Sequence, residues 1–415
     1  MRNRTLALAL AATLLAAACA PDEPPPDDAG TEAREIHDRV LTIDSHDDIP
    51  GTFGTADYNA CNAMDRQVDV PAMREGGLDV AFFIVYVGQG PRTPEGNENA
   101  LEQALRKFEG IRAMAEEQCP DQIEIAYRAD DVQRIRDSGK LVSVIGIENG
   151  YPIGNDISLI ERFHELGGRY MTLAHTSHND IADSSNPAEP EHGGLSAFGE
   201  QVVTEMNRVG MMVDVSHVSK DAALHAMRVS RSPVIASHSS TRAVADHVRN
   251  MDDETLLALQ QNGGVIQIVA FDGYVKVQPA SRSEELDTLG NEFGIPGGRG
   301  GRGAIAALPD SVRVEYERRR DEIMARYPGA TVADFVDHID HAVRLIGIDH
   351  VGISSDFDGG GGVTGWDDAA ETFNVTVELL SRGYSEEEIA KLWGQNLLRV
   401  WRDVERIAGE IQAGA

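Results

Sequence analysis

Basic residues are scarce in this chain of 415 residues. It contains 37 Lys and Arg residues against 68 Asp and Glu residues, which gives a formal net charge of −31 at pH 7. Binding to nucleic-acid phosphates requires a basic surface, so this balance argues against a nucleic-acid partner. A strongly acidic surface instead favours solubility and attracts cations. Lysine is especially rare, and the five lysines are Lys107, Lys140, Lys220, Lys276 and Lys391.

An apolar run from Leu6 to Ala18 is too short to span a membrane. It follows two arginines and ends in small residues before Cys19, so residues 1–18 have the form of a signal peptide. The stretch Leu15–Cys19 resembles a bacterial lipobox, and by that resemblance Cys19 would carry a lipid. The sequence thus predicts an exported protein, anchored by this lipid to a bacterial membrane and facing the periplasm or the exterior. An ordinary signal peptide with an incidental cysteine is the alternative.

Cysteine is also rare, with three residues in the whole chain. Export would place Cys61 and Cys119 in an oxidising compartment, where a disulfide between them is favoured over free thiols. Two unpaired thiols are the alternative, because the sequence does not give the distance between them.

The composition after the signal peptide predicts a tether followed by one large domain. Residues 19–34 are rich in proline and acidic side chains and poor in apolar ones, which is typical of a disordered tether. The whole chain has 41% hydrophobic and 25% charged residues, as globular proteins do, and is long enough to bury a large core. We assign residues 35–410 to this domain.

Eight short β-rich segments alternate with segments of helical periodicity, such as Ala100–Glu117 and Lys220–Val229. Alternating strands and helices favour a parallel sheet, and eight such units predict an α/β protein with a (β/α)8 TIM barrel. The predicted strands are Val40–Ser45, Val80–Val87, Leu141–Ile147, Tyr170–Ala174, Met211–Ser216, Pro233–Ser237, Val265–Ala270 and His350–Ser355. Between the last two, residues 272–332 form a long insertion, with a glycine-rich loop at 297–303 and an Arg-rich helix at about 311–327.

A histidine or a carboxylate stands at the end of six of these strands. The carboxyl ends of barrel strands meet at one rim, where the active sites of this fold lie. Any one of these residues alone would equally fit a cap or a turn. The set on a shared rim is what predicts a metal centre, and its members are His46, Asp48, Glu148, His175, His217, His238 and Asp356.

The spacing of these residues predicts two metal ions. His46 and Asp48 are two apart, so both point to one face of an extended segment and can bind one cation. His217 and His238 follow neighbouring strands and can hold a second cation. Glu148 lies between the two groups in strand order, and its two oxygens can bridge the ions. Imidazole and carboxylate ligands suit Zn²⁺, and two such ions lower the pKa of a bridging water and polarise a carbonyl.

Two aspartates are candidates for the proton carrier beside these metals. Asp356 and Asp358 have the same parity, and Asp356 is favoured because it is nearer the strand. It would take a proton from the attacking water and pass it to the leaving amine. Asp44 has the parity of His46 and is a candidate for orienting a metal ligand.

The sequence resembles the renal (membrane) dipeptidases over about residues 35–405. The resemblance is carried by motifs in unbroken order: Asp44–Pro50, Val68–Pro71 with Arg74–Gly77, Ile145–Gly150, Tyr170–His175, Gly194–Gly199, Gly210–His217, Ala236–Ser240, His350–Gly359 and Asn396–Val400. It implies a binuclear zinc peptidase of the amidohydrolase type, with two Zn²⁺ per subunit and dipeptides as substrates. A homodimer is common in the family.

The resemblance also implies residue roles. His46 and Asp48 would bind one zinc ion, His217 and His238 the other, and Glu148 would bridge them. Some amidohydrolases bridge their metals through a carbamylated lysine, but none of the five lysines lies at a predicted strand end. The remaining implied roles are the acid–base residue Asp356, the substrate-carbonyl contact His175 and the substrate-carboxylate contact Arg249.

Arg249 has an alternative role as a surface residue paired with Asp252 or Asp253. A guanidinium at a fixed distance from the metals would bind a free carboxylate bidentately and so separate dipeptides from longer chains. The residue accepted at the second position, L or D, is left open. Alternatives for the whole protein are lactam or ester hydrolysis on the same barrel and a lipoprotein that binds peptides without turnover.

Overall fold

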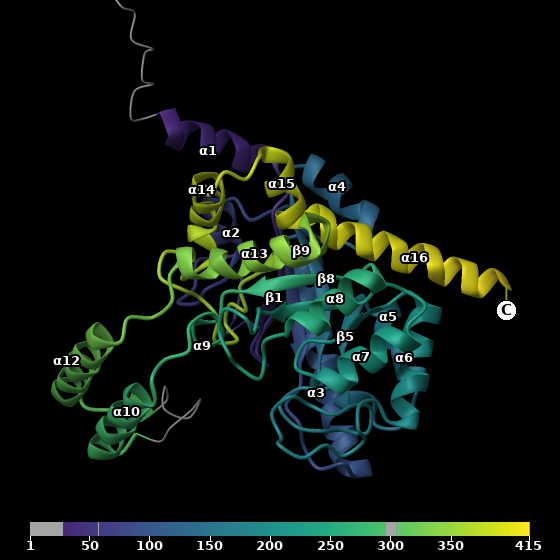
Figure 1. The fold of residues 1–415 in the computed structure, drawn as a ribbon, viewed down its shortest axis with the longest axis horizontal. Coiled ribbons are helices and arrows are strands. Elements are labelled where there is room, and N and C mark those ends of the chain that lie inside the picture. Colours follow the sequence, from purple (N-terminus) through teal and green to yellow (C-terminus); the bar gives the residue numbers. More distant parts are fainter. Residues whose placement is uncertain (1–27, 57, 296–303, 306, 415) are drawn as a thin grey trace, which may run out of the picture.

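The computed structural model describes residues 28–295, apart from 57, and residues 304–305 and 307–414. Eight parallel strands form a nearly closed barrel, which confirms the predicted fold (Figure 1). In their order around the barrel they are β1 (Ile43–Asp48), β2 (Val80–Tyr86), β4 (Leu141–Glu148), β5 (Gly168–Thr172), β6 (Met212–Asp214), β7 (Ile235–Ser239), β8 (Val265–Val269) and β9 (Val351–Ser354). The predicted signal peptide, the predicted lipid attachment site Cys19 and the predicted glycine-rich loop lie outside the described residues.

The barrel closes between β9 and β1 through a few specific contacts. The main-chain N–H of Asp48 donates to the carbonyl of Phe357 at 2.8 Å. The N–H of Ser355 donates to the Asp44 carboxylate at 2.9 Å. Asp44, expected to orient a ligand, therefore also joins the first and last strands of the barrel.

The strands are apolar because both of their faces are buried. Phe82 and Phe83 are neighbours on β2 and point to opposite faces, yet both are fully buried. One face packs inside the barrel and the other against the surrounding helices. This explains why near-continuous apolar runs, rather than alternating ones, marked the strands in the sequence.

Helices cover the outside of the barrel (Figure 1). They include every helix predicted by periodicity, with bounds shifted by a few residues. They are α2 (Val70–Gly76), α3 (Pro94–Ala113), α4 (Ala129–Asp137), α5 (Ser158–Glu165), α6 (Ala197–Val209), α7 (Lys220–Val229), α8 (Asp253–Asn262), α13 (Val332–Ile346), α14 (Phe373–Ser381), α15 (Glu386–Ala390) and α16 (Asn396–Gly414). None of the described helices is long and apolar enough to cross a membrane.

The folded region begins earlier than expected. Helix α1 spans Asp28–Arg39, so residues 28–34 are helical and the prediction of a tether up to residue 34 is wrong for them. Ala33 and Ile36 are buried. His37 is buried too, and its ring nitrogens bond the Thr376 hydroxyl of α14 at 2.7 Å and the Gly76 carbonyl at 2.8 Å. Ala33, Ile36 and His37 lie on one face of the helix, and their burial stabilises it. The acidic and proline-rich composition of residues 19–34 gave no sign of this buried face.

A ninth strand was missed. β3 (Ile123–Ile125) pairs in parallel with β4 outside the barrel order. With three residues it carries too little pattern to be recognised without its partner.

The described part of the insertion at residues 272–332 includes three helices, of which the second and third project from the barrel (Figure 1). They are α9 (Asp272–Val275), α10 (Ala280–Phe293) and α12 (Asp310–Arg326), the last of which confirms the predicted Arg-rich helix. The projecting pair has its own small apolar cluster, which includes Leu289, Tyr316 and Ile323.

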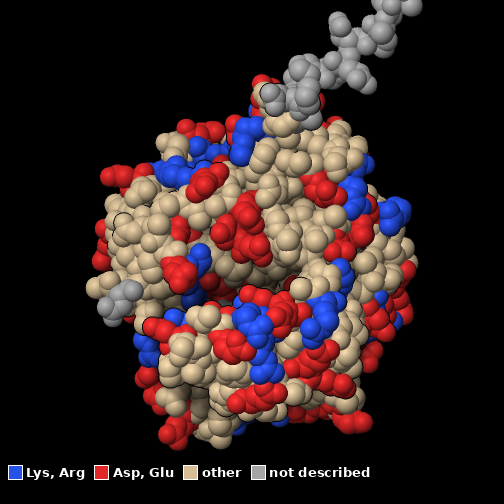
Figure 2. Space-filling model, turned by 90° about the vertical axis from the view of Figure 1, so that its left-hand side faces the viewer, with Lys and Arg blue, Asp and Glu red and all other residues tan. Residues whose placement is uncertain are grey.

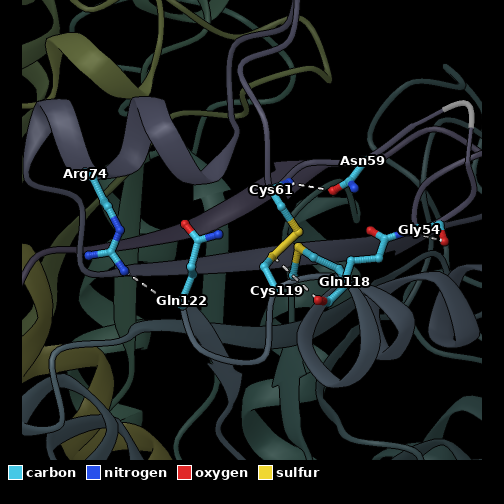
Figure 3. Close-up of a disulfide and its surroundings, with 8 residues drawn as sticks. Gly54, Asn59, Cys61, Arg74, Gln118, Cys119 and Gln122 are labelled. Atoms are coloured by element: carbon cyan, nitrogen blue, oxygen red, sulfur yellow. Dashed lines mark hydrogen bonds between the residues drawn. A yellow bond between two sulfur atoms is a disulfide. The ribbon is translucent and has the colours of Figure 1, made fainter.

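Cys61 and Cys119 form a disulfide, as favoured from the sequence (Figure 3). The bond joins the loop after β1 to a π-helical turn at Met114–Gln118, which continues α3. A hydrogen bond from Gln118 Nε2 to the Gly54 carbonyl, 2.8 Å long, supports the same attachment. The loop that follows the first predicted metal ligands is thus fixed to a neighbouring helix.

Candidate metal centre and active site

The predicted site residues converge at the carboxyl end of the barrel. Glu148 is the last residue of β4, His175 and His217 follow β5 and β6, and Asp356 follows β9. The structure differs from the predicted bounds in four cases: His46, Asp48, Glu148 and His238 lie within strands rather than after them. β1 and β7 are longer at this end because Asp48 pairs with Ile84 and Ser239 with Ile268 of the adjacent strands.

The two oxygens of Glu148 face two different sets of groups. Three imidazole nitrogens surround Oε1: Nε2 of His175 at 3.3 Å, of His217 at 3.0 Å and of His238 at 3.3 Å. Oε2 lies 3.8 Å from Nε2 of His46. Glu148 therefore lies between His46 on one side and three imidazoles on the other.

On the side of Glu148 Oε2, His46 also lies close to two further carboxylates. Its Nε2 lies 3.9 Å from Asp48 Oδ2 and 4.0 Å from Asp356 Oδ1. Three groups of potential ligand atoms result, each within 4.8 Å: His46, Glu148 and His238; Glu148, His175 and His217; and His46, Asp48 and Asp356.

The hydrogen bonding of the two ring nitrogens of His46 tests whether these residues fit a metal ion. Its Nδ1 bonds the Tyr170 hydroxyl at 2.8 Å, which fixes the ring. Its Nε2 is buried without a hydrogen-bond partner among the described residues and faces the shared space. A buried polar atom without a partner is costly, and coordination to a cation would satisfy it. The donor set of imidazoles and carboxylates fits Zn²⁺.

The imidazoles of His217 and His238 are held neutral, as metal ligands must be. Burial lowers the pKa of His217 well below its usual value, and the positive charge of Arg249 lowers it further. Burial, then the charge of His46, has the same effect on the pKa of His238. Their Nε2 atoms lie 2.8 Å apart beside Glu148.

The carboxyl groups differ in their proton affinity. Burial would raise the pKa of Glu148, but the neighbouring histidines, His175 and His46 first, hold it well below its usual value. Burial, reinforced by Asp48 and Glu148, raises the pKa of Asp356 well above its usual value. Burial would lower the pKa of His46, but nearby carboxylates, Glu148 foremost, raise it to about 9. The site therefore pairs a carboxyl of lowered pKa, Glu148, with one of raised pKa, Asp356.

A buried network orients His238. Its Nδ1 bonds the Ser237 hydroxyl at 2.8 Å, and that hydroxyl donates to Asp214 Oδ2 at 2.7 Å. Asp214 also accepts from Thr172 Oγ1 at 2.5 Å and from the N–H of Ser216 at 3.0 Å. Sequence reasoning missed this support, together with Tyr170. The available signal was Asp214 itself, a carboxylate within an otherwise apolar strand.

Backbone strain is concentrated at this rim. Among the described residues other than glycine, a positive φ occurs at Asn149 (77°), His217 (66°), Asp356 (61°) and Asp358 (61°). All four follow barrel strands. Such conformations cost about 1–3 kcal/mol each and persist where the surrounding structure enforces them, most often at functional sites.

The rim encloses a cavity of about 510 Å³. Its walls include Asp48, Glu148, His175, His217 and Asp356, together with Phe271, Tyr274, Asp358 and the glycines Gly359 and Gly360. On the side from which α10 and α12 project, the surface is hollowed near its centre, and acidic and basic side chains both border the hollow (Figure 2). The candidate ligands are thus accessible to a small molecule.

The comparisons with known proteins agree with this geometry. The family model for Membrane dipeptidase (Peptidase family M19) matches residues 31–414. The chain belongs to the membrane dipeptidase family.

Its relatives match over most of their length. "Dipeptidase aclJ" of Aspergillus oryzae is 32% identical, across 90% of this chain and 80% of that protein. "Dipeptidase tcpJ" of Claviceps purpurea is 36% identical, across 82% and 70%. Among solved structures, the "probable dipeptidase PvdM" from Pseudomonas aeruginosa is 35% identical with a TM-score of 0.80, and the match covers 92% of this chain and all of that one.

Arg249 lies beside the cluster rather than on the molecular surface. It is 4% exposed, and Nη2 donates to the His238 carbonyl at 3.0 Å. Its guanidinium lies 5.2 Å from the ring centre of Tyr274, which lines the cavity. The alternative pairing with Asp252 or Asp253 is not seen. Asp252 instead contacts Lys220.

The two candidate proton carriers occupy different environments. Asp356 contacts His46 in the cluster, whereas Asp358 pairs with Arg66 Nε at 3.1 Å. Asp358 lines the same cavity, but its carboxylate is engaged by Arg66. This placement favours Asp356, the residue chosen from the sequence.

Proposed function

We propose that the protein is a zinc-dependent dipeptidase that hydrolyses the peptide bond of free dipeptides. The observation that carries the proposal is Glu148 in an accessible cavity: its Oε1 faces three imidazoles, and its Oε2 faces His46, which lies beside two further carboxylates. Membership of the family supports the reaction class, and the names of its relatives support dipeptides as substrates.

Five residues would hold two zinc ions. His46 and Asp48 would bind one ion, His217 and His238 the other, and Glu148 both. When bound, the two ions would supply positive charge that polarises the substrate carbonyl and makes a water molecule more acidic. The low proton affinity of His217 and His238 supports their part, because a neutral imidazole has a lone pair available.

The other residues would handle the proton and the substrate. The raised pKa of Asp356 suits a group that takes a proton from water and returns it to the leaving amine. His175 lies on the cavity wall, where its ring can donate to the carbonyl oxygen of the substrate. Arg249 would bind the free carboxylate of the dipeptide, with Tyr274 beside it.

A dipeptide library with L or D residues at the second position tests the proposal. The zinc-loaded protein is assayed on these peptides and on matched N-acetylated and C-amidated forms. Cleavage that is lost on C-amidation is expected, because Arg249 would lose its carboxylate partner. If metal is verified and no dipeptide is cleaved, the proposed function is wrong. Lactam and ester substrates and peptide binding without turnover would then be examined.

We also propose that the protein is exported and carries a lipid on Cys19. The Cys61–Cys119 disulfide supports export, because such bonds persist in oxidising compartments. The protein should fractionate with membranes, and Cys19→Ala should release it. Wild-type protein in the soluble fraction would contradict the anchor.

A further inference from the structure

In the loop that carries Asp356, Phe357 is buried against Trp366, but the stretch that follows Asp358 has no side chains to hold its conformation. Asp356 and Asp358 both have a φ of 61°, in the left-handed region. The next four residues, 359–362, are all glycine. Glycine offers no side chain to pack and has the largest conformational freedom of any residue. Contacts from outside must therefore fix this glycine stretch, and one of them joins the Gly362 N–H to the Ala270 carbonyl at 2.8 Å.

Gln67 supplies further contacts from the segment before α2. Its Oε1 accepts from the N–H of Asp358 at 2.8 Å. Its Nε2 donates to the carbonyls of Gly361 at 2.9 Å and Asp367 at 2.7 Å. Its main chain adds a bond from the Gln67 N–H to Asp358 Oδ1 at 3.3 Å and one from the Ala369 N–H to the Gln67 carbonyl at 2.8 Å. One amide thus binds both ends of the glycine stretch.

The loop is packed so tightly that a shift of its backbone would displace the Asp356 carboxylate. A Cβ atom on Gly359 would overlap the carboxylates of Asp356 and Asp48, so both acids rest directly on this backbone. A Cβ on Gly361 would overlap the carbonyl of Ser355. The positions of Gly359–Gly361 and of the Asp356 carboxylate are therefore coupled through direct contact.

The segment that carries Gln67 is itself fixed at two places. The Cys61–Cys119 disulfide attaches it to the π-helical turn after α3 (Figure 3). Asp69 caps α2 by accepting from the N–H of Ala72 at 2.8 Å, and its other oxygen accepts from the N–H of Met64 at 2.7 Å. Gln67 lies between these attachments and can act as a rigid support.

We propose that Gln67 is a positioning residue for Asp356: its amide holds the strained loop so that this carboxyl group faces His46 and the cavity. The proposal rests on the proposed function, in which Asp356 moves the proton. Gln67 would not touch the substrate. It would act on turnover through the loop alone.

Two variants test whether the hydrogen bonds of the Gln67 amide, rather than the size of the side chain, support the loop. Gln67→Met has nearly the same length but no amide. Gln67→Glu keeps an acceptor for the Asp358 N–H but places an oxygen against two carbonyls. Gln260→Met is the matched control, because Gln260 Nε2 also donates to a main-chain carbonyl, that of Ile346 at 2.8 Å, and does not line the cavity.

Both Gln67 variants should lower kcat by about 100-fold, the cost typical of a misplaced catalytic group, with KM changed by less than about threefold. Bound zinc should equal that of the wild type, because Asp48, although it also contacts Gly359, is held in β1 by its pairing with β2. The amides of residues 355–362 should exchange hydrogen faster. Gln260→Met should leave kcat and these amides unchanged.

Three results would overturn the proposal: a kcat equal to that of the control, a parallel loss of zinc and activity, or unchanged exchange in the loop. If the wild type cleaves no dipeptide, the proposed function fails separately. Hydrogen exchange in the Gln67 variants then still decides whether this residue holds the loop.

Discussion

The disulfide offers a stability prediction whose size follows from the structure. Cys61 and Cys119 are 58 residues apart in the sequence. Closing a loop of this length removes about 14 cal/mol/K of chain entropy from the unfolded state, or about 4 kcal/mol at 25 °C. Replacing both cysteines by serine should therefore lower the free energy of unfolding by about this amount. Replacing both also avoids an unpaired thiol.

Urea denaturation followed by circular dichroism measures the effect. With a denaturant slope of about 3 kcal/mol per M, the midpoint should fall by about 1.4 M. Wild-type protein incubated with a thiol reductant should show a similar midpoint, and thiol titration should find the pair oxidised before reduction. A midpoint shift below about 0.3 M would refute the reasoning, because it would mean that the unfolded chain gains little freedom when the bond is removed.

Three further predictions concern single residues. Asp356→Asn should lower kcat by about 10²–10⁴ while zinc content stays at the wild-type level, and loss of zinc would make Asp356 a ligand instead. Arg249→Ala should raise KM for dipeptides by about 10- to 100-fold, as expected for a charged hydrogen bond, and an unchanged KM would leave it a structural role. Burial, then Arg169, lowers the pKa of His164 to about 4, below its unfolded value. Stability should therefore fall as the pH drops from about 6.5 to 4, because the unfolded state then binds the proton more readily. His164→Gln should flatten this fall in urea titrations across that range, and an equally steep fall would exclude His164 as its source.

The barrel and its candidate ligands were predictable because their signals are local in the sequence. Parallel strands buried on both faces appear as short apolar runs, and β2 and β4 are such runs. A histidine or carboxylate at the end of such a run must reach the catalytic rim once the fold is a barrel. His46, Glu148 and His217 could therefore be placed at this rim from the sequence alone. The disulfide could be favoured only through the expected compartment.

Features that depend on distant partners could not be predicted. Helix α1 is stabilised by the contact of His37 with Thr376, more than 300 residues along the chain. β3 is defined only by its pairing with β4. The acidic composition before α1 and the short length of β3 gave no sign of these partners.

The sequence by itself determined the barrel, the residue types of the metal centre and the family. Each of these depends on which side chains follow which strand, and that order is written along the chain. Only the tertiary structure decided how the site is held. It places the Asp214–Ser237 network behind His238 and Gln67 against the glycine loop that carries Asp356. Hydrogen bonds of this kind join segments far apart in the sequence, and their geometry exists only once the packed barrel has fixed every strand in register.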